Sequence, residues 1–87
     1  MNLTFAKKGD KYEAVAAVSG SFNIHIEGGG DLISVYQRTA GTKYCMVREA
    51  CKTGDCYDND FFGEVYPKDI KVVCEDNPQV AILTEAQ

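Results

Sequence analysis

The strongest constraint on the fold is a strict alternation of apolar and polar side chains in residues 22–27. The run reads Phe22, Asn23, Ile24, His25, Ile26 and Glu27. Side chains of a β-strand point alternately to opposite faces, so a period of two predicts a strand with one buried and one solvated face. We therefore expect Phe22, Ile24 and Ile26 in the core, and the histidine between the isoleucines in solvent.

Three glycines, at positions 28–30, follow this run and precede Asp31. A phosphate-binding loop needs glycines that lead into a helix N-terminus, where backbone N–H groups converge on an anion. Residues 32–38 are instead β-branched and aromatic, which favours a second strand, central in its sheet. We expect the glycines to supply positive φ angles in a hairpin connection that lets the second strand return beside the first.

Short β-type runs separated by turn residues continue along the whole chain, a pattern typical of an all-β sandwich or barrel. In residues 11–19 several alanines blur the period, and a short helix is the alternative there, but Val15 and Val18 favour a strand. Ile70, Val72 and Cys74 share one face of a later run. The further strands expected are residues 2–6, 11–19, 43–50, 70–75 and 79–85, with a short strand at 61–66.

The sequence therefore predicts one domain over residues 1–87. Its fold class is all-β: a small antiparallel β-sandwich, immunoglobulin-like or jelly-roll, with seven to eight short strands. A chain of 87 residues buries a modest core, and small domains of this kind often gain stability from disulfides, a metal ion or oligomerisation.

Charge argues against several classes of partner. The chain has 13 acidic and 9 basic residues, for a net charge of −4, and its basic residues are scattered. A nucleic-acid-binding surface would need a basic patch, so we expect no direct contact with nucleic acid. No apolar run is long enough to cross a bilayer, so no membrane partner is expected. The first residues lack the apolar core of a signal peptide, which predicts synthesis in the cytoplasm.

Four cysteines, Cys45, Cys51, Cys56 and Cys74, leave three alternatives open. Free thiols come first, with Cys45 and Cys74 as small core residues and the other two in a loop. Two disulfides formed after release into an oxidising space come second, for which Cys51 and Cys56 could face each other across a hairpin and Cys45 and Cys74 could pair across the core. A zinc site comes third, since the close cysteine pairs of such sites are absent.

Residues 57–66 are expected to form an irregular acidic loop that holds the best binding candidates. Carboxylates on a flexible loop suit Ca²⁺, but an EF-hand alignment puts Phe62 where a ligand should be. We therefore expect a solvated loop with no metal or cofactor. One phenylalanine of the adjacent pair can face the core, and the other is then free for an interface. The interface or binding candidates are Tyr57, Asp58, Asp60, Phe61 and Phe62.

An enzyme is the least favoured reading. His25 is the single histidine, and the sequence identifies no nucleophile or acid beside it. A domain of this size also has little room for a closed active site.

The order of strands and turns resembles that of small virion proteins of tailed bacteriophages. The motifs are "SGSF" with its alternating strand, the glycine-rich turn, the strand ending in "VYQR", and a polar turn before "KYCMV". The segment "VYPKDIKVVCEDNPQVAILTEA" looks like the closing hairpin of those proteins. Arg38 is not followed by their usual "SxDGG" turn, and the cysteine-bearing segment 51–63 is atypical of them.

This resemblance implies a non-enzymatic auxiliary component of a phage virion, one that decorates or associates with the capsid. Its partners would be other virion proteins and further copies of itself in a homo-oligomer, and its location the virion. The alternative is a small ligand- or carbohydrate-binding module, Ca²⁺-dependent, that uses Tyr57, Phe61 and Phe62 with their acidic neighbours.

Overall fold

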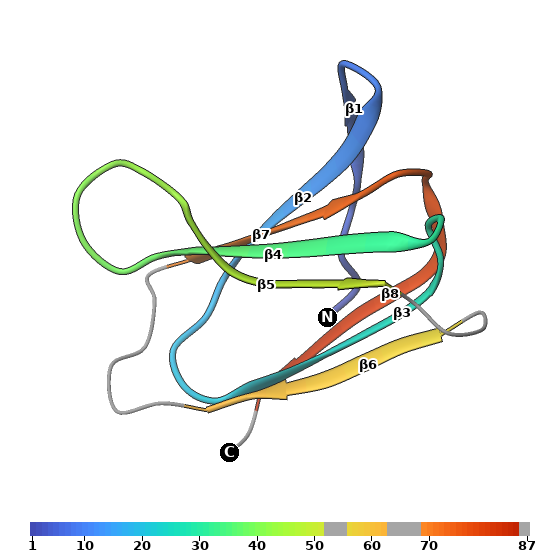
Figure 1. Cartoon of the computed structure of the whole chain (residues 1–87). Coiled ribbons are helices and arrows are strands. Elements are labelled where there is room, and N and C mark those ends of the chain that lie inside the picture. Colours follow the sequence, from blue (N-terminus) through green and yellow to red (C-terminus); the bar gives the residue numbers. More distant parts are fainter. Residues whose placement is uncertain (52–55, 63–68, 86–87) are drawn as a thin grey trace.

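The computed structural model describes residues 1–51, 56–62 and 69–85, and these form eight β-strands (Figure 1). The strands are β1 (Ala6–Lys8), β2 (Lys11–Ala17), β3 (Phe22–Gly28), β4 (Leu32–Arg38), β5 (Cys45–Cys51), β6 (Cys56–Phe61), β7 (Asp69–Cys74) and β8 (Pro78–Glu85). The described part of the chain contains no helix long and apolar enough to cross a membrane.

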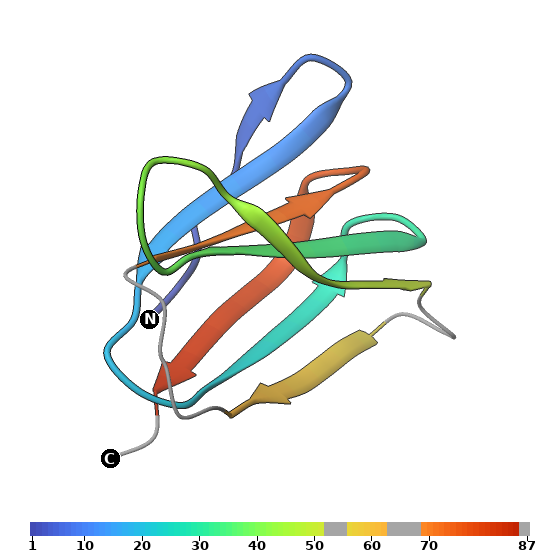
Figure 2. The same cartoon turned by 60° about the vertical axis from the view of Figure 1, so that its left-hand side comes forward.

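The strands form two antiparallel sheets that lie one over the other (Figures 1 and 2). The larger sheet has the order β1-β2-β7-β4-β5, and the smaller has the order β6-β3-β8. Each pairing is antiparallel. The predicted class, a small antiparallel β-sandwich, is confirmed.

The core lies between the inner faces of the two sheets. The smaller sheet contributes Ile24, Ile26 and Leu83, all 1% exposed or less. The larger sheet contributes the inner residues of β4 and β7, namely Ile33, Val35, Ile70, Val72 and Cys74. The predicted alternation is confirmed in both sheets, because the residues between these anchors are partly or fully exposed.

The glycine triplet is not a hairpin, and that expectation is wrong. The φ angles of Gly28, Gly29 and Gly30 are positive, as expected, at 80°, 84° and 86°. However, β3 lies in the smaller sheet and β4 in the larger, so this connection passes the chain from one sheet to the other. Strand β4 is paired on both sides, with β7 and β5, which leaves no place for β3 beside it.

The chain crosses between the sheets against the turn that joins β7 to β8. The N–H of Asp76 donates to the carbonyl oxygen of Gly29 at 3.1 Å. The Glu75 carboxylate accepts hydrogen bonds from the backbone N–H groups of Asp31, at 2.7 Å, and of Leu32, at 2.9 Å. Two corners of the sandwich are thus joined by polar contacts.

Two further expectations about the strands are wrong. The acidic stretch after Cys56 begins with strand β6 rather than an irregular loop, because Tyr57, Asn59 and Phe61 alternate inward against β3. Near the N-terminus, Asn2 forms only an isolated bridge to Ile82, and the first strand is Ala6–Lys8. Most of the strand expected at residues 61–66 lies outside the described residues.

Candidate functional site

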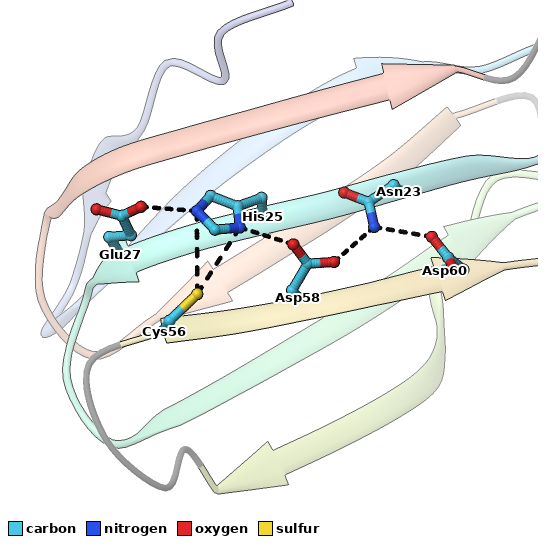
Figure 3. A network of polar contacts seen from close by, with 6 residues as sticks. All are labelled: Asn23, His25, Glu27, Cys56, Asp58 and Asp60. Atoms are coloured by element: carbon cyan, nitrogen blue, oxygen red, sulfur yellow. Dashed lines mark hydrogen bonds and ion pairs between the residues drawn. The ribbon is translucent and has the colours of Figure 1, made fainter.

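The outer face of the smaller sheet carries a connected set of polar side chains (Figure 3). Strands β3 and β6 pair so that Asn23 is opposite Asp60, His25 opposite Asp58, and Glu27 opposite Cys56. Directly opposite residues point to the same face of a sheet, and their Cβ atoms lie about 5 Å apart. The register therefore gathers these six residues on one surface, which we call the acidic face.

His25 is at the centre of the acidic face. Its Nδ1 lies 2.7 Å from Oδ2 of Asp58, and its Nε2 lies 2.7 Å from Oε2 of Glu27. These hydrogen bonds, that of Glu27 first and that of Asp58 second, raise the pKa of His25 above its ordinary value of 6.5. A charged imidazolium donates from both nitrogens, so this geometry fits the protonated ring.

Asn23 extends the set along both strands. Its Nδ2 donates to Oδ1 of Asp58 at 2.7 Å and to Oδ1 of Asp60 at 2.8 Å. The hydrogen bonds from Asn23 and then from His25 lower the pKa of Asp58. The contacts thus run without a break from Glu27 to Asp60 and hold three exposed carboxylates in defined positions.

Cys56 lies beside the histidine ring, with Sγ 3.7 Å from Nδ1 and 3.9 Å from Nε2 of His25. A thiol, an imidazole and an Asp therefore do meet, although the sequence alone identified no partner for His25. The geometry is not that of a nucleophile and its base, because each ring nitrogen already faces a carboxylate. Within the described residues, no three His, Cys, Asp or Glu side chains are arranged to hold a metal ion.

An open hollow of about 740 Å³ adjoins the acidic face. It lies where the glycine connection meets the β7–β8 turn, and it shares Glu27 and Cys56 with the acidic face. Its lining residues are Glu27, Gly28, Gly29, Gly30, Cys56, Asp76, Asn77 and Gln79.

The structure separates the binding candidates expected from the sequence. Asp58 and Asp60 lie on the acidic face, and Phe62 is 80% exposed just after β6. Tyr57, in contrast, is buried, and Phe61 stacks on Phe22 with ring centroids 4.9 Å apart. Tyr57 and Phe61 point inward because they share the inner face of β6, so of the three aromatic candidates Phe62 is the one available to a partner.

No disulfide joins any two of the four cysteines, all of which lie in the described residues. Cys74 is buried in the core, as expected, whereas Cys45 is exposed because it begins β5, an edge strand exposed along most of its length. Cys51 ends β5 in the larger sheet and Cys56 begins β6 in the smaller, so these two do not face each other across a hairpin. The residues between them lie outside the described part of the chain.

Sequence reasoning missed the site because it assigned β6 to a loop. The signal was present: Cys56, Asp58 and Asp60 alternate with Tyr57, Asn59 and Phe61, with the same period as residues 22–27. Glu27 is two residues from His25 on the same face of β3, whereas Asp58, 33 residues from His25 along the chain, meets it through the pairing of β3 with β6.

Comparison with known proteins finds no relative of this chain. No family model matches the chain, and neither the curated proteins nor the solved structures contain a significant match.

Proposed function

We propose that this protein is a non-enzymatic interaction protein, an auxiliary component of a tailed-phage virion that docks on other virion proteins. The observation that carries the proposal is the acidic face, where Glu27, Asp58 and Asp60 are exposed and yet held in place. The order of the sequence motifs, which resembles that of small phage virion proteins, supports the virion assignment.

Fixed carboxylates suit recognition of another protein. Side chains that are already ordered lose less conformational entropy on binding, so more of the interaction free energy appears as affinity. The strands of the smaller sheet carry four carboxylates, the fourth being that of Glu85, and neither Lys nor Arg. The partner surface should therefore be basic, and its encounter with this face should be faster at low salt.

Mass spectrometry of purified virus particles tests the virion assignment, because a decoration or capsid-associated protein is present there in many copies. Co-sedimentation of the purified protein with particles that lack it tests the docking face. We expect Asp58→Asn with Asp60→Asn to reduce co-sedimentation at least tenfold, while Asp10→Asn, in the exposed β1–β2 turn, leaves it unchanged. Absence from particles together with failure to co-sediment would overturn the proposal.

A second candidate function is a small-ligand module, which the hollow beside the acidic face favours. Glu27 and Asp76 bring carboxylates to it, and Asn77 and Gln79 bring amides. These are oxygen-bearing groups of the kind that bind Ca²⁺ and sugar hydroxyls. Millimolar Ca²⁺ or sugars should then raise the unfolding temperature, and Asp76→Asn should remove the shift. An unchanged unfolding temperature would exclude this candidate.

A further inference from the structure

The two sheets carry charges of opposite sign, which the net charge of the chain conceals. The strands of the smaller sheet have four acidic residues and neither Lys nor Arg; their one basic side chain is His25, which Glu27 and Asp58 already bind. The strands of the larger sheet have six basic and three acidic residues. The basic residues of the larger sheet are Lys7, Lys8, Lys11, Arg38, Arg48 and Lys71, and the acidic ones are Glu13, Glu49 and Asp69. Two of the basic residues lie on the inner side of the sheet, because Lys7 is in register with Tyr12 and the buried Cys74, and Arg48 is opposite the buried Val35.

The outer face of the larger sheet has a row of four residues that runs across its strands. Val15 of β2 is opposite Lys71 of β7, which is opposite Tyr36 of β4, which is opposite Met46 of β5. Val15 and Met46, at the ends of the row, are 57% and 51% exposed. The centre of the row is therefore a cation beside an aromatic ring, with an exposed apolar side chain on each side.

Aromatic rings hold the basic side chains on this face. The Nζ of Lys71 lies 4.8 Å from the ring centroid of Tyr36 and 5.0 Å from that of Tyr44. The Cζ of Arg38 lies 5.5 Å from the Tyr44 ring, and its Nη2 lies 2.6 Å from Oδ2 of Asp69. We call this surface the basic–aromatic face; its residues are Val15, Tyr36, Arg38, Tyr44, Met46 and Lys71.

The composition of the basic–aromatic face is that of a protein interface. Tyr, Arg and Met are enriched at the cores of interfaces, and Tyr and Arg are frequent hot spots within them. Val15 and Met46 are half-exposed, so a partner that covers this sheet face removes apolar surface from water and lowers the free energy.

We propose that the basic–aromatic face of one copy of the chain docks on the acidic face of a second copy. Lys71 would lie against Asp58 and Asp60, and the exposed ring of Phe62, next to Asp60 in the chain, would reach the apolar end at Met46. Glu13 and Glu49 occupy the next cross-strand row of the larger sheet. Their like charge excludes the carboxylates of the second copy from that row and so limits the docking orientation.

This contact is head-to-tail, because the two faces lie on opposite sides of the sandwich. Each copy keeps one unused acidic or basic–aromatic face, so repetition gives a ring if the rotation closes and a filament if it does not. Symmetric contacts between two acidic faces, or between two basic–aromatic faces, would bring like charges together. The inference deepens the proposed function, since it names a second copy of the chain as one of the partners.

Sedimentation velocity of the purified chain tests the proposal. We expect assembly at about 0.01 M salt and its loss near 1 M, since the Debye length falls from about 30 Å to about 3 Å over that range. Asp60→Lys alone and Lys71→Glu alone should each associate at least tenfold more weakly than the natural chain. The matched controls are Asp10→Lys, in a turn, and Lys7→Glu. Lys7 is opposite Tyr12, so its side chain lies on the side of the β1–β2 hairpin away from the basic–aromatic face.

The decisive measurement is an equimolar mixture of the two variants. In a head-to-tail contact, Lys71→Glu still offers an intact acidic face and Asp60→Lys an intact basic–aromatic face. The mixture should therefore form heterodimers at protein concentrations at which each variant alone is monomeric. A monomeric natural chain at low salt, or a mixture that stays monomeric, would overturn the proposal. Thermal unfolding of each variant confirms that it is folded, and Asp60→Asn with Lys71→Gln repeats the test with milder changes.

The two proposals fail in different ways. A chain that is abundant in virus particles but monomeric in solution retains the virion role and loses the self-association. A chain that assembles head-to-tail but never occurs in particles keeps the self-association and loses the virion role.

Discussion

The two sheets are built on the same alternation of residues and yet hold their outer side chains by different chemistry. On the smaller sheet, hydrogen bonds and ion pairs join Glu27, His25, Asp58 and Asn23. On the larger sheet, Tyr36 and Tyr44 hold Lys71 by cation–π contacts. The contacts of the acidic face depend on the protonation of His25, and those of the basic–aromatic face depend on the aromatic rings beside Lys71. The strand pattern fixes which residues face outward, and the cross-strand register decides which of them interact.

The largest effect is expected in the core, where the two sheets pack against each other. Ile24 of the smaller sheet and Ile70 of the larger are 0% and 1% exposed. Replacing either by Ala should cost about 2–5 kcal/mol, because methyl groups are lost and a cavity remains. Urea unfolding should show one cooperative transition in both variants. Two transitions, or a large loss in one variant alone, would mean that the sheets are separate units of stability.

The crossing between the sheets gives the next largest effect. Gly30 has a φ of 86°, and a Cβ added there would lie 2.8 Å from Cβ of Glu75. Gly30→Ala should therefore cost at least about 1–3 kcal/mol, the range for a residue held at a disfavoured φ. Gly20→Ala is the matched control, because Gly20 lacks a positive φ and an added Cβ would meet nothing within 4 Å. Equal unfolding midpoints for the two variants would contradict this account of the crossing.

The dependence of stability on pH should distinguish the acidic face. Because the pKa of His25 is raised in the folded chain, its contribution is fully present below the unfolded value near 6.5. That contribution is lost as pH rises through the folded pKa. Because the pKa of Asp58 is lowered, its contribution is lost as pH falls below about 3.8, its ordinary value, and through its folded pKa.

The difference in unfolding temperature between the natural chain and His25→Gln should therefore be largest between about pH 3.8 and pH 6.5, and should shrink as pH rises through the folded pKa of His25. Titration of the His25 ring by NMR measures the same effect directly. A midpoint at or below 6.5 would show that the carboxylates of Glu27 and Asp58 do not hold the proton.

The smallest effect is expected on the basic–aromatic face. Lys71→Gln removes two cation–π contacts and should lower the stability of the monomer by about 0.5–1 kcal/mol, the range for exposed pairs of this kind. Lys7→Gln removes a charge from the same sheet but from an exposed position on β1, and should leave stability within about 0.5 kcal/mol. Urea unfolding at high salt, where self-association is weak, measures both. Equal stabilities would mean that the rings of Tyr36 and Tyr44 do not stabilise the folded chain through Lys71.

The sequence predicts what depends on local pattern and misses what depends on pairing. The period of two places Ile24, Ile26, Ile70 and Val72 in the core correctly, and the positive φ angles of the glycines follow from their lack of a Cβ. The alternation does not show which of the two sheets a strand joins, because a period of two is satisfied equally by any antiparallel neighbour.

The acidic face shows the same limit. Its residues are recognisable as polar positions of strands, but the meeting of His25 with Asp58 requires the register of β3 on β6. The acidic composition of β6 also favoured a loop, since Asp and Asn are depleted in strands, whereas the packing of Phe61 on Phe22 outweighs that preference. Tertiary contact overrides local propensity at this strand.

The position of β8 has a consequence for how the chain acquires its structure. Strand β3 lies between β6 and β8, so the smaller sheet is incomplete until its last strand is present. Ribosomes add about 5–20 residues each second, so Ile24 and Ile26 wait several seconds after their own synthesis for the partners that cover them. Folding dominated by such distant pairings takes about milliseconds to seconds once the chain is free. During synthesis, the apolar side of β3 is therefore a surface that a chaperone could bind.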